Sequence, residues 1–247
     1  MSSISIQFIG SGDAFASGGK FNTCFHIKEP LSEILIDCDA SSLIGIKKSG
    51  INPNNISHIF ISHFHGDHFG GLPFLILDAQ LVQVRSQPLK IIGPLGVEER
   101  VNTLMEAMFK GSTAINFSFD IIFIEIQDEI PTQVDDKTVT YFPVIHSPES
   151  NPHGLRIELD GKIIAYSGDT EWTDSLISLA DGADLFIVEC YNRKGLMKFH
   201  MNYDDLSVKR NQLNCRQIML THLGDDMLEF SRDSEFEVCE DGKIVVL

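Results

Sequence analysis

The interpretation of this chain starts from one short stretch, Ser62-His63-Phe64-His65-Gly66-Asp67-His68. It overlaps the end of the apolar run His58–Ser62, which has the composition of a β-strand, and it precedes the pair Gly70-Gly71, where a helical pattern begins. The chain holds 9 histidines in 247 residues. We expect the pattern HxHxDH by accident in roughly one such chain in a thousand. The stretch therefore predicts a metal site.

The spacing of these side chains explains how they can bind metal. Residues i and i+2 at the end of a strand point to the same side, so His63 and His65 can present both imidazoles to one ion. The chain can turn at Gly66, because glycine adopts conformations that other residues avoid. Asp67 and His68 then face a second position nearby, which predicts two adjacent metal ions.

Three further candidate ligands also follow apolar runs. They are His146 after Thr138–Val144, Asp169 after Ile163–Tyr166 and His222 after Gln217–Leu220. Open α/β sheets place their functional sites at the carboxyl ends of strands, so these residues can meet the first group. The donor set contains imidazoles and carboxylates without sulfur. This set favours two divalent metal ions of the zinc type, Zn²⁺, with Mn²⁺ or Fe²⁺ as alternatives.

Composition restricts the partners and the compartment. With 19 basic and 35 acidic side chains the formal net charge is −16, so nucleic acid and anionic membranes repel the protein at long range. No apolar run approaches the ~18 residues of a membrane span, and segment 1–12 lacks the basic flank and apolar core of a signal peptide. The 5 cysteines form no CxxC pair, which is typical of reduced thiols. We expect a cytoplasmic protein with no membrane partner.

Strand-like and helical patterns are interspersed along the chain, which predicts a mixed α/β fold. The predicted strands are Ile4–Ile9, Asn22–Ile27, Ile34–Asp37, His58–Ser62, Leu89–Ile92, Phe117–Ile126, Thr138–Val144, Leu155–Leu159, Ile163–Tyr166, Leu185–Glu189, Gln217–Leu220 and Ile244–Leu247. The predicted helices are Ala40–Ser49, Leu72–Val84, Gly96–Lys110, Asp174–Ala180 and Tyr203–Leu213. No linker long enough to separate domains is present, so we expect one domain over residues 1–247.

In their order along the chain, HFHGDH, His146, Asp169 and His222 resemble the ligands of the metallo-β-lactamase superfamily, and the resemblance spans essentially the whole sequence. It implies a four-layer αβ/βα sandwich with the metals in a cleft at the edge of the sheets. It also implies the ligand assignment. The first metal is held by His63, His65 and His146, the second by Asp67, His68 and His222, and Asp169 bridges both. Asp37 is implied to support the HFHGDH loop from behind the ligands.

A finer resemblance is to the ribonuclease Z branch of that superfamily. Its marks are Gly10-Ser11-Gly12-Asp13-Ala14-Phe15, Ile92-Gly93-Pro94, Ser167-Gly168-Asp169-Thr170, Val188-Glu189 and Phe199-His200-Met201. In that branch a histidine at the place of His200 lies beside the metals and acts in catalysis. The resemblance therefore implies a catalytic His200, and we expect Glu189 to orient it.

Two departures from the branch bear on the substrate. Bacterial ribonuclease Z enzymes carry a long arm that grips tRNA between the residues matching His146 and Asp169, where this chain has only the 22 residues 147–168. Asn202 stands where the branch usually has threonine or serine, although asparagine caps a helix equally well. The missing arm and the net charge of −16 disfavour tRNA as a partner and favour a small anionic ester substrate.

These residues predict a binuclear metal-dependent hydrolase, and we favour a phosphodiesterase acting on a small or short phosphodiester. Two metals lower the pKa of water from roughly 15.7 to about 7 and can hold the hydroxide for in-line attack on phosphorus. We expect Asp67 to accept the proton of that water, and His200 to stabilise the developing charge or protonate the leaving oxygen. Candidates for substrate binding are Arg193, Lys194, Lys198 and His153, the last in the loop after His146.

Other functions stay open on the sequence alone. The same two-metal site suits hydrolysis of an arylsulfate, a thioester or a lactone. A further alternative is a di-iron redox protein or a metal-binding scaffold without turnover, although di-iron members of the superfamily carry glutamate where His65 stands. The resemblance also favours a homodimer, for which the apolar run Leu72–Val84 can supply the contact.

Overall fold

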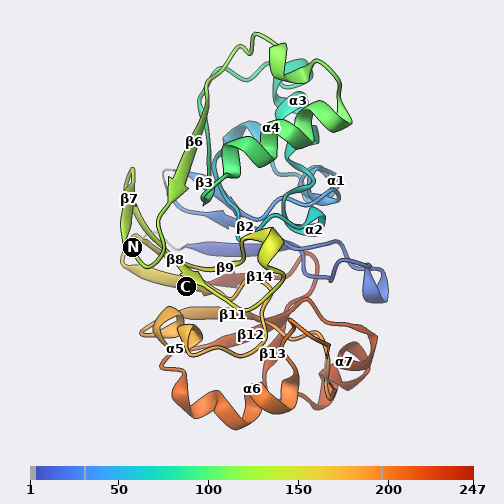
Figure 1. The fold of residues 1–247 in the computed structure, drawn as a ribbon, viewed down its shortest axis with the longest axis vertical. Coiled ribbons are helices and arrows are strands. Elements are labelled where there is room, and N and C mark those ends of the chain that lie inside the picture. The colour runs from blue at the N-terminus through green and yellow to red at the C-terminus, as the bar shows by residue number, and fades with distance from the viewer. Residues whose placement is uncertain (1–3, 31, 196) are drawn as a thin grey trace.

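The molecule is built on two β-sheets that face each other, with helices on the outer side of each (Figure 1). The computed structural model describes residues 4–30, 32–195 and 197–247. Residues 1–3, which belong to the N-terminal segment 1–12 without the features of a signal peptide, therefore lie outside the described residues. Within the described ranges each sheet contains seven strands. This arrangement confirms the predicted four-layer αβ/βα sandwich.

The two halves of the chain contribute to different sheets, apart from the last strand. The first sheet contains β1 (Ser5–Gly10), β2 (Cys24–Lys28), β3 (Glu33–Ile36), β4 (Ile56–Phe60), β5 (Leu89–Pro94), β6 (Ile121–Ile126) and β14 (Ile244–Val246). The second contains β7 (Thr132–Val134), β8 (Lys137–Pro143), β9 (His153–Leu159), β10 (Lys162–Tyr166), β11 (Leu185–Glu189), β12 (Ile218–Thr221) and β13 (Glu237–Val238). The C-terminal strand β14 returns to pair with β1.

The helices belong to the outer layers. They are α1 (Ser42–Lys48), α2 (Gly66–Phe69), α3 (Leu72–Leu81), α4 (Val97–Met108), α5 (Ser175–Ala180), α6 (Tyr203–Lys209) and α7 (Asp225–Phe230). Short 3₁₀ turns occupy Ser17–Gly19, Pro53–Asn55, Ser112–Ala114, Pro148–Ser150, Arg210–Gln212 and Ser231–Asp233. Figure 1 shows α3 and α4 against the first sheet and α5, α6 and α7 on the far side of the second.

Both sheets follow the same plan. In the first, β14, β1, β2 and β3 are antiparallel neighbours, and β3, β4, β5 and β6 are parallel. In the second, β7 to β10 are antiparallel neighbours, and β10 to β13 are parallel. Parallel strands end at the same edge of a sheet, so each sheet gathers several carboxyl ends at one edge.

The core between the sheets follows from the alternation of side chains along the strands. In β3, Ile34 and Ile36 belong to the apolar cluster between the sheets, whereas Leu35 packs with the helices. β11 repeats this alternation, with Ile187 in the inner cluster and Val188 in the outer one. Successive side chains point to opposite faces, so strands that are apolar at every position are those buried on both faces.

The candidate metal ligands lie just beyond strand ends, as predicted. The HFHGDH stretch follows β4, His146 follows β8, Asp169 follows β10 and His222 follows β12. The first of these strands belongs to one sheet and the other three belong to the second. The site therefore forms where the edges of the two sheets meet.

Some predicted boundaries are wrong for physical reasons. The strand predicted over Phe117–Ile126 begins only at Ile121, because Phe119 is buried against the helical layer and pairing with β5 starts at Ile121. The short strands β7 and β13 were not predicted. His153 is not in a loop: it is the first residue of β9, where it pairs with Pro143 of β8.

The apolar run Leu72–Val84 is divided between core and surface. Its helix α3 ends at Leu81, and Leu75 and Ile76 are buried against the first sheet. Leu81, Val82 and Val84 at the end of the run are 64–73 % exposed. The homodimer through this face stays a prediction.

None of the helices in the described ranges is long and apolar enough to cross a membrane.

Gly71 makes a close backbone contact between α3 and the loop after β3. Its N–H donates to the carbonyl of Cys38 at 2.8 Å, and a Cβ at this position would lie 1.8 Å from the carbonyl oxygen of Asp39. We predict that Gly71→Ala lowers the free energy of unfolding by about 1–3 kcal/mol, because the two backbones must separate. Urea denaturation measures this loss.

Gly66→Ala is the matched control for that substitution. Gly66 begins α2 without the positive φ that favours glycine, so the glycine-specific turn expected from the sequence is not present. A Cβ at Gly66 would also meet no atom within 4 Å, so we expect the free energy of unfolding to change by less than about 0.5 kcal/mol. Equal losses in the two variants would contradict the proposed backbone contact.

Candidate metal centre

The HFHGDH stretch is held in place by a buried carboxylate behind it. Asp37 Oδ1 accepts a hydrogen bond from the backbone N–H of Ser62 at 2.8 Å, and Oδ2 accepts one from the Ser62 hydroxyl at 2.8 Å. Nδ1 of His68 lies 2.7 Å from the same Oδ2, and the N–H of Cys38 donates to the carbonyl of His68 at 2.7 Å. These contacts place Asp37 where the resemblance implies a supporting residue.

Three of the candidate ligands are oriented by hydrogen bonds at Nδ1. His63 Nδ1 lies 3.0 Å from the hydroxyl of Ser62, and His146 Nδ1 lies 2.8 Å from the carbonyl of Phe199. His68 makes the corresponding contact with the carboxylate behind the loop. A histidine that donates from Nδ1 carries its lone pair on Nε2. All three Nε2 atoms are therefore available as metal ligands.

His63, His65 and His146 form the first donor group. Their ligand nitrogens all lie within 4.8 Å of one another. Nδ1 of His65 is 3.0 Å from Nε2 of His146, and the ring of His63 meets both other rings edge to face, with centroids 4.9 and 5.2 Å away. The loops after β4 and β8 thus bring together the three residues that the resemblance assigns to one ion.

The second donor group contains Asp67, His68, Asp169 and His222, again with ligand atoms within 4.8 Å. Nε2 of His68 lies 3.2 Å from Asp67 Oδ2 and 3.3 Å from Asp169 Oδ1. Nε2 of His222 lies 3.3 Å from Asp169 Oδ2. The same Oδ2 is 3.9 Å from Nε2 of two imidazoles of the first group. One carboxylate therefore stands between the two groups.

Burial keeps the imidazoles of the first group neutral. It lowers the pKa of His65, holds the pKa of His63 well below its usual range and lowers the pKa of His146 to about 4. Neighbouring imidazoles add to this effect, because two positive rings would repel each other. Neutral imidazole is the form of histidine that binds a metal ion.

The second group instead favours positive charge at its centre. Burial opposes a charge on His68, but Asp169 and Asp67 outweigh it and raise the pKa of His68 well above its usual range. Burial likewise opposes a charge on Asp169, yet His222 and His68 keep its pKa well below the ordinary value. A divalent cation can supply the same positive charge in place of a proton.

The donor atoms fit metal ions because several of them are buried and make no hydrogen bond, although ion-pair contacts bring some of them close together. Among the residues that the structure describes, the buried atoms with no hydrogen bond include Nε2 of His63, Nε2 of His68 and Oδ1 of Asp169. Leaving such an atom unpaired costs about 1–3 kcal/mol, so their gathering at one place indicates a bound ligand. Nitrogen and carboxylate donors without sulfur suit zinc.

His200 lies beside the two groups. Its ring centroid is 4.9 Å from that of His146 and 5.7 Å from that of His222, and Nδ1 is 3.0 Å from Glu189 Oε1. Burial opposes a charge on His200, but Glu189 outweighs it and raises the pKa of His200 to about 9. The pairing predicted from the sequence is therefore present, and it favours the imidazolium form.

Glu189 also orients the turn that carries the bridging carboxylate. It is fully buried at the end of β11, and its Oε1 accepts a hydrogen bond from the N–H of Thr170 at 2.6 Å. Thr170 directly follows Asp169. The same side chain therefore fixes the position of His200 relative to Asp169.

The three candidate cations for substrate binding have different surroundings. The Arg193 guanidinium lies 4.1 Å from the ring centroid of Phe230, and Lys194 is exposed. Lys198 lies over the ring of Phe199 at 4.4 Å and lines a cavity together with His200. Of the three, Lys198 is therefore the one whose position suits a contact with substrate.

His153 does not fit the predicted substrate contact. Its side chain is buried, Nε2 lies 3.1 Å from Asp128 Oδ1, and Nδ1 lies 3.0 Å from the carbonyl of Asn151. Both ring nitrogens are thus engaged within the protein. The loop position is wrong, and these contacts do not support an approach to substrate, which stays a prediction for His153.

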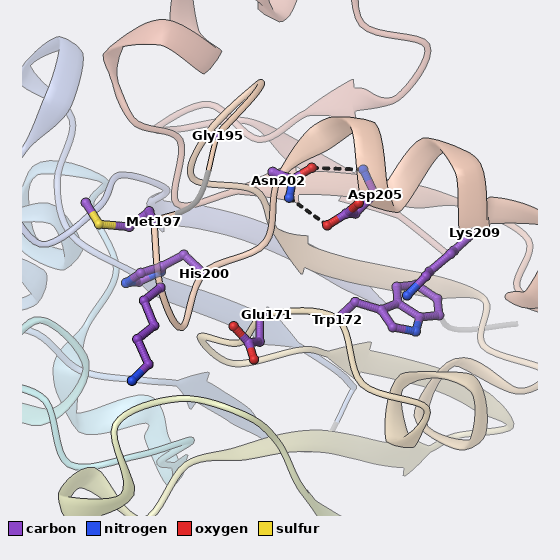
Figure 2. A pocket seen from close by; sticks show the side chains of 9 residues that line it. Glu171, Trp172, Gly195, Met197, His200, Asn202, Asp205 and Lys209 are labelled. Carbon is purple, nitrogen blue, oxygen red and sulfur yellow. Dashed lines mark hydrogen bonds between the residues drawn. The ribbon is translucent and has the colours of Figure 1, made fainter.

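Two aromatic residues near the site were missed from the sequence. Tyr191 packs its ring 5.1 Å from that of His200 and 6.2 Å from that of His222. Trp172 lines the cavity that also includes His200 (Figure 2). Neither belongs to a motif. The signal that could have found Trp172 is its place three residues after Asp169.

Several known proteins are similar to this chain in fold or in sequence. The ribonuclease Z of Enterococcus faecalis is 28 % identical over 270 residues, which cover 88 % of this chain and 86 % of that protein. The metallo-beta-lactamase fold protein YhfI of Bacillus subtilis superposes with a TM-score of 0.76 at 20 % identity, covering 99 % of this chain and 100 % of that one. The short form of human tRNase Z gives a TM-score of 0.77 at 23 % identity, covering 98 % of each chain.

These likenesses agree with the resemblance inferred from HFHGDH and the ligands that follow it. The protein is a metal-dependent hydrolase of the metallo-β-lactamase superfamily, of the phosphodiesterase and nuclease type, close to the ribonuclease Z-like branch. The family model of the anti-Pycsar protein Apyc1 matches residues 4–244, a span that includes both donor groups. The chain therefore belongs to the Apyc1 family of anti-Pycsar proteins.

Proposed function

We propose that this chain is a two-metal phosphodiesterase that cleaves small phosphodiesters. The observation that carries the proposal is the position of the Asp169 carboxylate between the two donor groups. One group is His63, His65 and His146, and the other is Asp67, His68 and His222. These residues would hold a pair of divalent ions, with zinc favoured by the nitrogen-rich donors, and the bound ions would supply an activated water and neutralise an anionic ester.

Two residues of the chain are placed to move protons. Burial acts to raise the pKa of Asp67, but the charge and hydrogen bond of His68 lower it, so Asp67 is a carboxylate that can accept the proton of the attacking water. Nδ1 of His200 is held by Glu189, which leaves Nε2–H for the leaving oxygen. His200 thus donates the proton that the departing alcohol needs.

The small size of the substrate is supported by the residues between His146 and Asp169. Segment 147–168 is taken up by a 3₁₀ turn, by β9 and by β10, which turn back on each other at Asp160-Gly161. This segment, all of it described by the structure, therefore forms no extended arm. A net charge of −16 also opposes the approach of a long polyanion such as tRNA.

We place the activity in the cytoplasm, since the free cysteines suit a reducing compartment.

A substrate panel tests this proposal. The zinc-loaded protein should hydrolyse bis(p-nitrophenyl) phosphate and cyclic nucleotides, and should leave precursor tRNA, an arylsulfate, a thioester and a lactone intact. Turnover confined to the lactone or thioester would replace the phosphodiesterase by another ester hydrolase. Metal binding without turnover of any substrate would indicate a scaffold.

Asp169→Ala tests the bridging role. Because Asp169 has contacts with both donor groups, the variant should bind fewer than two zinc ions per chain, measured by elemental analysis after gel filtration. Asp204→Ala, at an exposed position on α6, should keep the metal content of the unsubstituted protein. Full zinc occupancy in Asp169→Ala would show that the carboxylate does not bridge.

His200→Ala tests the proton donor. We expect kcat on a phosphodiester with a poor leaving group to fall by about 10²–10⁴-fold with unchanged zinc content, because a general acid is lost while the ligands remain. His26→Ala is a matched control, since His26 is also buried and paired with a carboxylate, Glu33, at 3.0 Å. It should lower stability and leave kcat unchanged. Unaltered kcat in His200→Ala would remove this residue from the mechanism.

A further inference from the structure

A cavity of about 460 Å³ adjoins the metal centre and shares His200 with it. Figure 2 shows His200 and Met197 on one side of this cavity, Trp172 and Lys209 on the other, and Glu171 between them. Its lining comes from the turn after Asp169, from the segment that carries His200, and from α6. The proposed phosphodiesterase mechanism assigns no role to most of this cavity.

The cavity is fixed relative to the metal centre by the backbone. Glu171 and Trp172 follow Asp169 after a single residue, and the N–H of Glu171 donates to the carbonyl of Ile145, next to His146, at 3.0 Å. On the opposite wall, the N–H of Phe199 donates to Glu171 Oε2 at 3.4 Å. A ligand group in the cavity therefore has a defined position relative to the metal ligands.

The chemistry of the lining suits a flat, uncharged ring. Trp172 is the single tryptophan of the chain, and Met197, 45 % exposed, adds a polarizable thioether. The Lys209 ammonium lies 4.7 Å from the centroid of the indole, on a long flexible stem that a ligand ring can displace. Indole and thioether surfaces bind aromatic rings by stacking and dispersion.

The positive charge of His200 is paired with Glu189 behind the lining, and the remaining charges of the lining cancel. The ammonium groups of Lys198 and Lys209 are matched by the carboxylates of Glu171 and Asp205, and Asp205 is held by Asn202 through two hydrogen bonds (Figure 2). A further phosphate group of a ligand would therefore be attracted only weakly to this cavity. An uncharged ring can bind here without electrostatic repulsion.

We propose that this cavity binds the alcohol half of the substrate, and that it selects an aromatic or heteroaromatic ring stacked on Trp172. This assignment rests on the proposed function, in which His200 protonates the leaving oxygen. The group attached to that oxygen must lie beside His200, and His200 is one of the residues that line the cavity. Trp172 is then a specificity-determining residue that touches the leaving group without contacting the metals.

Binding of two phosphomonoesters to the zinc-loaded protein tests the selection directly. Phenyl phosphate and cyclohexyl phosphate have nearly the same size, but only the first is flat and aromatic. Calorimetry should give phenyl phosphate at least about 5-fold higher affinity, the effect expected of stacking on an indole. Because the chain has a single tryptophan, phenyl phosphate should also quench the intrinsic fluorescence saturably. Equal affinities, or binding without quenching, would overturn the assignment.

Kinetics of Trp172 variants provide the second test. Trp172→Leu should raise KM for bis(p-nitrophenyl) phosphate by about 5–20-fold and change kcat by less than about 3-fold, because stacking acts on substrate and transition state alike. Trp172→Phe should recover most of the loss. Val208→Ala, an exposed neighbour on α6 outside the lining, should leave both constants unchanged.

The outcomes separate this inference from the proposed function. An unsubstituted protein without phosphodiester turnover would contradict the proposed function, while the two calorimetric affinities still decide whether the cavity selects aromatic rings. A folded Trp172→Leu variant with full turnover and unchanged KM would overturn the role of Trp172 and leave the phosphodiesterase intact.

Discussion

The structure depends on a buried carboxylate that must stay paired with positive charge. Asp169 is 2 % exposed, and its oxygens lie 3.3 Å from nitrogens of His68 and His222. An isolated charge in such a place would cost more free energy than a domain of this size has to lose. Burial keeps the nearby imidazoles of His63 and His146 neutral, which suits them as ligands and not as counter-charges. Bound metal ions would meet both requirements, because they would supply positive charge to the carboxylate and bind the neutral imidazoles.

The fold meets this constraint by bringing two sheets together at one edge. The loop after β4 comes from the first sheet, and the residues after β8, β10 and β12 come from the second. Asp37, directly after β3, holds the HFHGDH loop in place through hydrogen bonds with Ser62 and His68. The large apolar cluster between the sheets keeps these ends at a fixed separation. The rigidity of the site is thus a property of the sandwich as a whole.

Much of the site could be predicted because its signals are local. A histidine or aspartate directly after an apolar strand is visible in the sequence, and His146, Asp169 and His222 were found in this way. The order of those residues led to the fold, since the resemblance spans the whole chain. Pairing of Glu189 with His200 was also predicted correctly.

The features that the sequence did not reveal depend on tertiary contacts. His153 appeared to be a loop residue because nothing in the sequence indicates that β9 starts at its own position opposite Pro143. The contact of the Arg193 guanidinium with Phe230, which is distant in sequence, could not be predicted either. Trp172 belongs to no motif, and its relation to His200 follows only from the shared cavity.

Anomalous diffraction at the zinc absorption edge, from crystals grown with zinc, would locate the metal ions themselves. We expect two peaks within bonding distance of the two donor groups, with the carboxylate of Asp169 touching both. A single peak, no peak, or the seven side chains pointing away from one another would contradict a two-metal centre.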